Sequence, residues 1–120
     1  NNMGLDQYAG RHCWRKHARL QKFMATMWEQ QNPDVEPDGS FNLGFNAGDV
    51  PVEMTQEIVS KLEEAIKNNY KDYVASDGFF WGQQFQEEAA KEYQKQDLDF
   101  LADCKEALSN NDTLLYECSW

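Results

Sequence analysis

The stretch Met3-Gly4-Leu5-Asp6-Gln7-Tyr8-Ala9 alternates apolar and polar residues, which predicts a short β-strand near the start of the chain. Its counterpart near the other end is Thr113-Leu114-Leu115-Tyr116-Glu117-Cys118, which predicts a closing strand. The segments between them carry helical patterns. We therefore expect an α+β fold over a single domain, residues 1–120, in which the terminal strands form a small antiparallel sheet of two to three strands packed against three to four helices.

Three helical segments are predicted from apolar residues that recur every three or four positions. The first covers His12 to Gln31, and its apolar stripe consists of Leu20, Phe23, Met24, Met27 and Trp28. The second covers 56–70, with Thr55 as its N-cap. The third covers 83–109, with a break near Lys95-Gln96-Asp97 and with Leu98, Leu101 and Cys104 on its apolar face. Residues 32–50 contain two prolines and three glycines, so a loop is predicted there, with a brief strand over 40–45.

An unusual aromatic cluster, Gly78-Phe79-Phe80-Trp81-Gly82, lies before the third helical segment. Three consecutive large rings cannot all point into one core, because neighbouring side chains diverge in both strands and helices. At least one ring must therefore serve a second surface. We expect Phe79 and Phe80 to be core residues before Trp81, and Trp81 to face a groove or an interface.

Composition favours a folded, acidic protein. Of its 120 residues, 41% are hydrophobic and 13% aromatic, and the net charge is −10. Residues 1–28 carry a net charge of +4 and the remainder −14. The acidic bulk would repel nucleic acid and anionic membranes, so we expect no direct contact with either. The basic first helix either binds the acidic remainder of its own chain, which we favour, or faces an anion.

No apolar run approaches the length of a membrane span, and no secretion signal is visible, which favours the cytoplasm. Cys13, Cys104 and Cys118 lack metal-site spacing and suggest reduced thiols. Cys13 and His17 could supply two metal ligands or a thiolate and its base from one helix, but a structural cysteine beside a surface histidine is favoured. Acid clusters such as Asp97-x-Asp99 are interpreted as solvated faces. We predict no catalytic residues, no metal and no cofactor.

Several motifs together resemble a family of small, uncharacterised proteins of tailed bacteriophages. These motifs are Met3-Gly4-Leu5-Asp6-x-Tyr8, Trp14-Arg15-Lys16, Gly78-Phe79-Phe80-x-Gly82 and the terminal Tyr116-x-x-Ser119-Trp120. Their order and approximate spacing match across nearly the whole chain. Family members tend to have Asn and His at about the places where this chain has Ala18 and Gln21, and Cys118 replaces one serine of a terminal Ser-Ser pair. The resemblance implies a viral accessory protein in the cytoplasm of a bacterial host, without implying a reaction.

Three functions are carried forward. The leading one is a non-enzymatic interaction module that binds a host or phage protein. The second is an acidic nucleic-acid mimic that inhibits a host DNA-binding protein. The third is a small enzyme or a binding protein for an anionic small molecule, in which Arg15 of Trp14-Arg15-Lys16 holds the anion and Tyr8 or Tyr116 is a polar neighbour. The structural alternative for this motif is that Trp14 packs in the core while Arg15 pairs with an acid, either Asp6 or a residue of the last helices.

The candidate interaction or ligand residues share either an aromatic ring or a position in the basic motif. They are Trp14, Arg15, Lys16, Phe80, Trp81, Tyr116 and Trp120. Trp120 either packs beneath the N-terminal strand, which we favour, or forms part of a docking tail. The sequence gives no indication of the oligomeric state.

Overall fold

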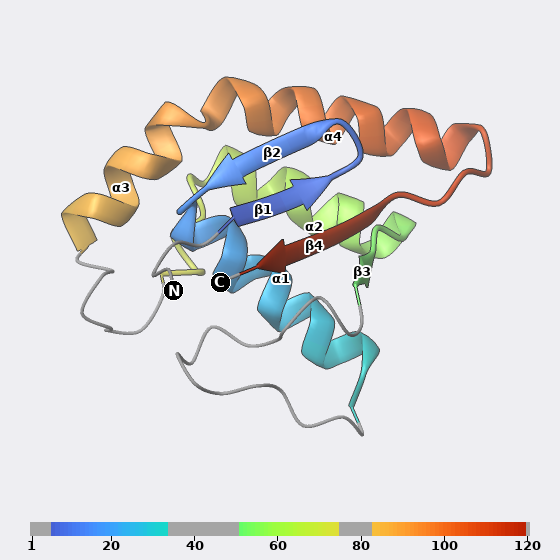
Figure 1. Cartoon of the computed structure of the whole chain (residues 1–120), viewed down its shortest axis with the longest axis horizontal. Coiled ribbons are helices and arrows are strands. Elements are labelled where there is room, and N and C mark those ends of the chain that lie inside the picture. The colour runs from blue at the N-terminus through green and yellow to red at the C-terminus, as the bar shows by residue number, and fades with distance from the viewer. Residues whose placement is uncertain (1–5, 34–50, 75–82, 120) are drawn as a thin grey trace.

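The computed structural model describes residues 6–33, 51–74 and 83–119 of the chain (Figure 1). Its elements, in order, are β1 (Asp6–Ala9), β2 (His12–Arg15), α1 (Ala18–Gln31), β3 (Val52–Glu53), α2 (Gln56–Lys67), α3 (Gln83–Glu92), α4 (Gln94–Ser109) and β4 (Leu115–Ser119). The strands form one antiparallel sheet in the order β2-β1-β4-β3. The predicted α+β fold is confirmed, and the terminal strands β1 and β4 lie side by side in the middle of the sheet.

The sheet has four strands in its described part, more than the two to three expected, partly because the first helix begins later than predicted. Residues 12–15 belong to β2, which pairs with β1 through the two-residue turn Gly10-Arg11. Gly10 has a φ of +58°, a conformation that a side chain would strain. The helix α1 starts only at Ala18, after His17 has accepted the backbone N–H of Leu20 as N-cap. The predicted apolar stripe of α1 is buried, as expected.

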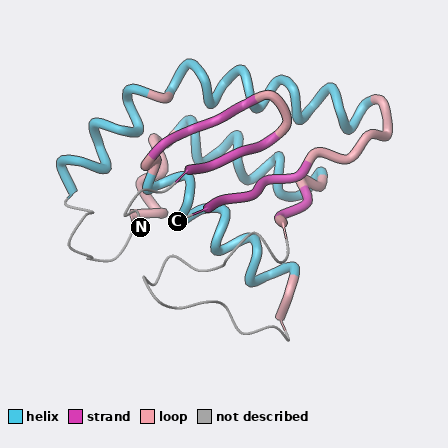
Figure 2. The backbone as a smooth tube through the Cα atoms, in the orientation of Figure 1, coloured by secondary structure: helices cyan, strands magenta, loops and turns pink. Residues whose placement is uncertain are grey.

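The sheet has one buried and one exposed face. Its buried side chains are Gln7, Ala9, His12, Trp14, Val52, Tyr116 and Cys118. They alternate along the strands with exposed or half-buried ones, as antiparallel strands with one solvated face require. The helices α1, α2 and α4 pack on the buried side, while α3 and α4 together form a long arc beside β2 (Figures 1 and 2).

Both edges of the sheet are covered by side chains that bond to the backbone as a neighbouring strand would. At the β2 edge, the Tyr93 hydroxyl donates to the Arg15 carbonyl and accepts from the Arg15 N–H, both at 3.0 Å. The Gln96 amide donates to the Cys13 carbonyl at 2.7 Å. At the β3 edge, the Gln31 amide donates to the Glu53 carbonyl at 2.8 Å and accepts its N–H at 3.1 Å. Unpaired backbone N–H and C=O groups at these edges could otherwise pair with a strand of another molecule.

The ends of α2 and α4 have the same cap. In each, an Asn in the left-handed conformation follows the helix: Asn69 (φ 55°) after α2 and Asn111 (φ 60°) after α4. The backbone bonds from Tyr70 to Ala65 (2.7 Å) and from Asn69 to Ile66 (3.0 Å) form a Schellman motif. This cap ends α2 at Lys67, three residues earlier than predicted. Thr55 caps its start by accepting the Ile58 N–H, as predicted.

The break in the last helical segment was predicted near Lys95-Gln96-Asp97 and is found at Tyr93. The reason is tertiary, because the Tyr93 hydroxyl is bound by β2 while the next turn carries Asp97 inward. Leu98 was expected on the apolar face but is 49% exposed, and Phe100 fills the core instead. None of the described helices is long and apolar enough to cross a membrane.

Candidate functional site

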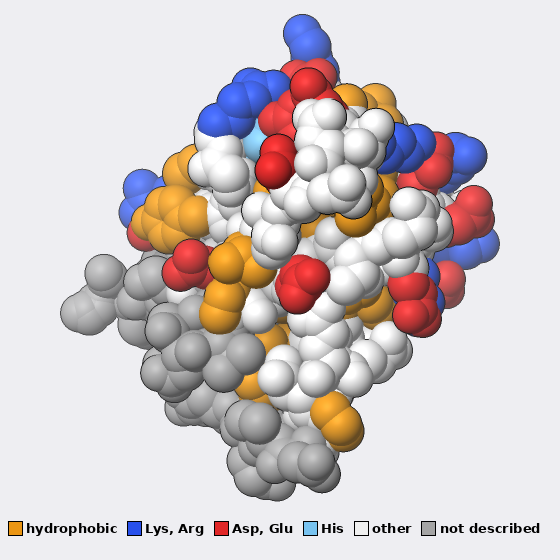
Figure 3. All heavy atoms as spheres, turned by 90° about the vertical axis from the view of Figure 1, so that its right-hand side faces the viewer, with side chains coloured by type: hydrophobic (Ala, Val, Ile, Leu, Met, Phe, Trp, Pro, Cys, Tyr) orange, Lys and Arg blue, Asp and Glu red, His pale blue; other side chains and the backbone are white. Residues whose placement is uncertain are grey.

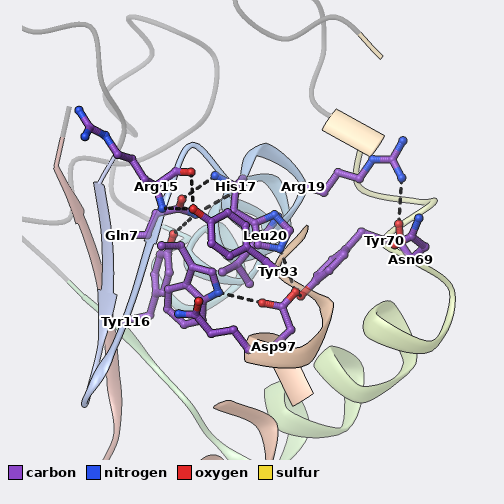
Figure 4. Close-up of polar contacts among 12 residues, drawn as sticks. Gln7, Arg15, His17, Arg19, Leu20, Asn69, Tyr70, Tyr93, Asp97 and Tyr116 are labelled. Carbon is purple, nitrogen blue, oxygen red and sulfur yellow. Dashed lines mark hydrogen bonds and ion pairs between the residues drawn. The ribbon is translucent and has the colours of Figure 1, made fainter. Parts of the chain in front are cut away.

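A buried carboxylate, Asp97 on α4, is the polar centre of the fold (Figure 4). One of its oxygens accepts the indole N–H of Trp14 at 2.8 Å. The other accepts the hydroxyl of Tyr70 and the Nε2 of His17, both at 2.8 Å. Three donors from β2, the α2 cap and the start of α1 thus satisfy one carboxylate, which is how a charge can be held in a protein interior.

His17 is fully buried and both of its ring nitrogens have partners. Nδ1 accepts the Leu20 N–H at 3.5 Å, which assigns the Nε2 proton to the bond with Asp97. The ring is stacked on Tyr93 at 5.3 Å and meets the edge of Tyr70 at 5.2 Å. The favoured sequence reading placed this histidine on the surface and Cys13 inside. The structure reverses both, because Cys13 points to the exposed face of β2.

A second buried network joins the two central strands to α1. The Gln7 amide donates to the Tyr116 hydroxyl at 3.0 Å and to the His17 carbonyl at 3.1 Å, and its oxygen accepts the His17 N–H at 2.9 Å. The Tyr116 hydroxyl donates to the Gln21 oxygen at 2.6 Å. Gln7 and Gln21 therefore satisfy polar groups inside the core rather than binding anything outside it.

Both buried tyrosines are held as neutral phenols. Burial, and then the charge of Asp97, raise the pKa of Tyr70 well above its ordinary value of 10. Burial is also the main cause that raises the pKa of Tyr116 well above 10. A phenol that keeps its proton at every physiological pH can donate a hydrogen bond but cannot act as a base. The two networks are thus suited to fixing the packing of the sheet on its helices.

The structure separates the residues of the Trp14-Arg15-Lys16 motif. Trp14 is buried, with its ring edge-on to Phe100 at 5.0 Å. Arg15 points to solvent, and its Nε lies 3.6 Å from the Asp6 carboxylate, which is one of the partners that the structural alternative named for it. Lys16 takes a left-handed φ of 59° at the turn into α1. This motif lies on β2 and the following turn and not, as expected, within the first helix.

Of the other candidate residues, Tyr116 is fully buried. Trp14 and Tyr116 therefore pack in the core, where neither offers a surface to a partner or a ligand. Phe80, Trp81 and the rest of the aromatic cluster at 78–82 lie outside the described residues, as do Trp120 and the brief strand predicted over 40–45. Arg15 and Lys16 are the candidates that the structure leaves at the surface.

Arg15 and Lys16 do border a hollow of about 340 Å³, together with Glu88, Ala89, Glu92 and Tyr93. The two acids on α3 face the two cations. A purely anionic ligand would meet carboxylates in this hollow, and neither Trp14 nor Tyr116 lines it. This hollow therefore differs from the anion site predicted from the sequence, both in its carboxylates and in the absence of Tyr116 from its lining.

A smaller cluster ties the β1–β2 turn to α4. The Asp103 carboxylate accepts from Arg11 Nε at 2.9 Å and lies 2.6 Å from His12 Nε2. These two hydrogen bonds, His12 first and Arg11 second, lower the pKa of Asp103 from its ordinary 3.8. The cluster therefore fastens the hairpin to the helix most firmly when Asp103 is ionised.

We expect acid to weaken this cluster. Because the folded-state pKa of Asp103 is lowered, its contribution to stability is complete above pH 3.8 and is lost as the pH falls through the folded-state value. Thermal unfolding of wild type and Asp103→Asn should therefore differ more at about pH 7 than at about pH 3, because the contribution of Asp103 begins to fall below its ordinary pKa of 3.8. The exposed Asp99→Asn serves as the control. An equal difference at both pH values would contradict the assignment.

The three cysteines are free; Cys104 and Cys118 are buried and Cys13 is exposed. Burial raises the pKa of Cys104 to about 12, so this thiol is a poor nucleophile at neutral pH.

Asp97 is the functional-site residue that the sequence analysis missed most clearly, since a solvated face was expected there. Within the described ranges, no group of three or more His, Cys, Asp or Glu side chains is placed to hold a metal ion.

Comparison with known proteins does not add a relative to this picture. No protein-family model, no curated protein and no solved structure matches the chain.

Proposed function

We propose that the protein is a non-enzymatic interaction module that binds a host or phage protein in the cytoplasm of an infected bacterium. The observation that carries this proposal is the exposed face of the sheet. Tyr8 on β1 is 45% exposed and Leu115 on β4 is 39% exposed, and both lie on this face. Large exposed side chains on a rigid sheet are what an interface uses as anchors.

The surroundings of Tyr8 fit this role. Tyr8 is paired across the sheet with Cys13 on one side and Glu117 on the other, and Leu115 is paired with Glu53. Asp6 lies two residues before Tyr8 on β1, and Arg15 is paired with Asp6 on β2. An apolar centre with a charged rim is the common anatomy of a protein interface. The resemblance of the sequence motifs to phage accessory proteins supports the same class of function and suggests its cellular setting.

The buried chemistry supports a binding role over catalysis. The two histidines of the chain are both buried and hydrogen bonded to carboxylates that tie helices to strands. A general base must reach a substrate proton, and these rings face the interior. No direct contact with nucleic acid or a membrane is proposed.

The two other functions have less support. For a nucleic-acid mimic, acids should line up with few cations between them, yet Lys61, Lys67 and Lys105 pair with acids on α2. Acidic and basic side chains are also intermixed on the face shown in Figure 3. A small-molecule site at Arg15 and Lys16 would need a ligand that tolerates Glu88 and Glu92.

The proposal can be tested by affinity capture from bacterial lysate with wild type and four variants of the protein. Tyr8→Ala and Leu115→Ala should each reduce the recovery of a partner that wild type captures, whereas Leu98→Ala, an equally exposed site on α4, should not. Trp81→Ala tests the interface role expected for the aromatic cluster. Equal recovery with Tyr8→Ala, Leu115→Ala and wild type would remove the exposed sheet face from the proposal.

A further inference from the structure

Arg19 on α1 is a buried cation that lacks a counter-ion within the described part of the chain. The side chain is only 6% exposed. One guanidinium nitrogen donates to the Asn69 carbonyl at 3.0 Å, and its buried Nε has no hydrogen-bond partner. Burying a charge without an ionic partner is unfavourable, and an unsatisfied buried donor adds to that penalty. The described part of the fold therefore leaves one donor of Arg19 without an acceptor.

The nearby buried acid does not fill this role. Asp97 already accepts hydrogen bonds from Trp14, His17 and Tyr70. In Figure 4 the Arg19 side chain extends away from Asp97 and toward Asn69, on the other side of Tyr70. The charge of Arg19 is thus presented at the junction between α1 and the end of α2.

Two lysines lie near Arg19, and one of them, Lys71, borders a hollow that also contains two acids. Lys22 is partly exposed and lies three residues further along α1, on the same side of the helix. Lys71 is exposed and follows the α2 cap that Arg19 contacts. Among the described residues, none of these three cations takes part in an ion pair, whereas Arg11 and Arg15 do. The basic charge near the start of the chain is therefore only partly neutralised by its own acids.

We propose that Arg19 is the centre of a binding site for a small oxyanion, a carboxylate or phosphate group, at the junction of α1 and the α2 cap. The planar guanidinium presents parallel N–H donors that match two oxygens of such a group. The ligand oxygen accepts the Nε proton that the fold leaves unused, and Lys22 and Lys71 add attraction around it. This site is separate from the exposed sheet face and does not depend on the proposed function.

The test measures thermal unfolding with increasing sodium phosphate or sodium acetate, each against sodium chloride of equal ionic strength. At about ten times the dissociation constant, wild type should melt roughly 4 °C higher than in chloride. Arg19→Met should lose this increase, and Arg19→Lys, which keeps the charge but not the fork, should bind roughly tenfold more weakly. Arg15→Met, which removes an exposed cation, should keep the full increase.

A second measurement does not depend on the stability of the variants. The Arg19 Nε–H signal in a ¹H–¹⁵N spectrum, assigned by its absence from Arg19→Lys, should shift saturably with the anion that binds. A response to phosphate alone indicates a phosphate-bearing ligand, and a response to acetate alone indicates a carboxylate. If neither anion acts beyond chloride, or if Arg19→Met keeps the response, Arg19 only caps α2 and the proposal is overturned.

Discussion

Replacing Asp97 with alanine is expected to lower the free energy of unfolding by about 3–5 kcal/mol, because a buried charge-assisted network loses its acceptor. Trp14 Nε1, His17 Nε2 and the Tyr70 hydroxyl would each remain buried with an unused proton. This loss is a large share of the roughly 5–15 kcal/mol that stabilises a domain. Urea unfolding followed by circular dichroism measures it as a lower midpoint at an unchanged slope.

The chain offers a close control for this experiment two residues away. Asp99 lies on the same helix, carries the same carboxylate and is exposed, so Asp99→Ala should change stability by no more than ~0.5 kcal/mol. Asp97→Asn, which keeps one acceptor oxygen, should fall between the two. If Asp97→Ala unfolds at the same urea concentration as Asp99→Ala, the network does not stabilise the fold in solution.

The contrast between Asp97 and Asp99 explains much of what sequence reasoning could and could not predict. Both acids lie in a polar stretch, which predicts a solvated face for each. The partners of Asp97 are 83, 80 and 27 residues away in the sequence, so no local sequence pattern predicts these hydrogen bonds. Tertiary contacts decide which carboxylate is buried, and the hydrophobic periodicity of the sequence does not indicate it.

The elements that were predicted well are those with local causes. The first strand alternates in polarity, and Thr55 stands directly before an amphipathic run, so both can be recognised within a few residues. The strand β2 was missed because residues 12–15 were included in the first predicted helix. The signal that could have found it is Gly10, which opens a two-residue hairpin turn.

The caps of α2 and α4 give a second example of what local sequence patterns cannot decide. Asn68 and Asn69 lie inside the predicted helix 56–70, although asparagine is a poor helix former. In the structure, Asn69 instead takes the left-handed position at which asparagine is one of the favoured residues. A residue that weakens a helix interior can thus strengthen its end, and only the exact position of the end decides between the two.

Trp14→Ala is expected to destabilise the protein by about 3–5 kcal/mol, the range for truncating a large buried aromatic side chain. The indole is buried, packs edge-on against Phe100 and donates to Asp97. Trp14→Phe keeps a ring beside Phe100 but removes the N–H, so it should cost about 1–2 kcal/mol. Urea unfolding measures both, and Tyr8→Ala on the exposed face of the neighbouring strand is the matched control.

The two residues with the largest expected effects share one hydrogen bond, which makes their energies interdependent. The double variant Trp14→Ala/Asp97→Ala should be more stable than the sum of the single effects implies, by about 0.5–3 kcal/mol, since the bond can be lost only once. Simple additivity would show that Trp14 stabilises the core by packing alone. A Trp14→Ala protein as stable as wild type would place this ring at the surface after all and restore it as a candidate for binding.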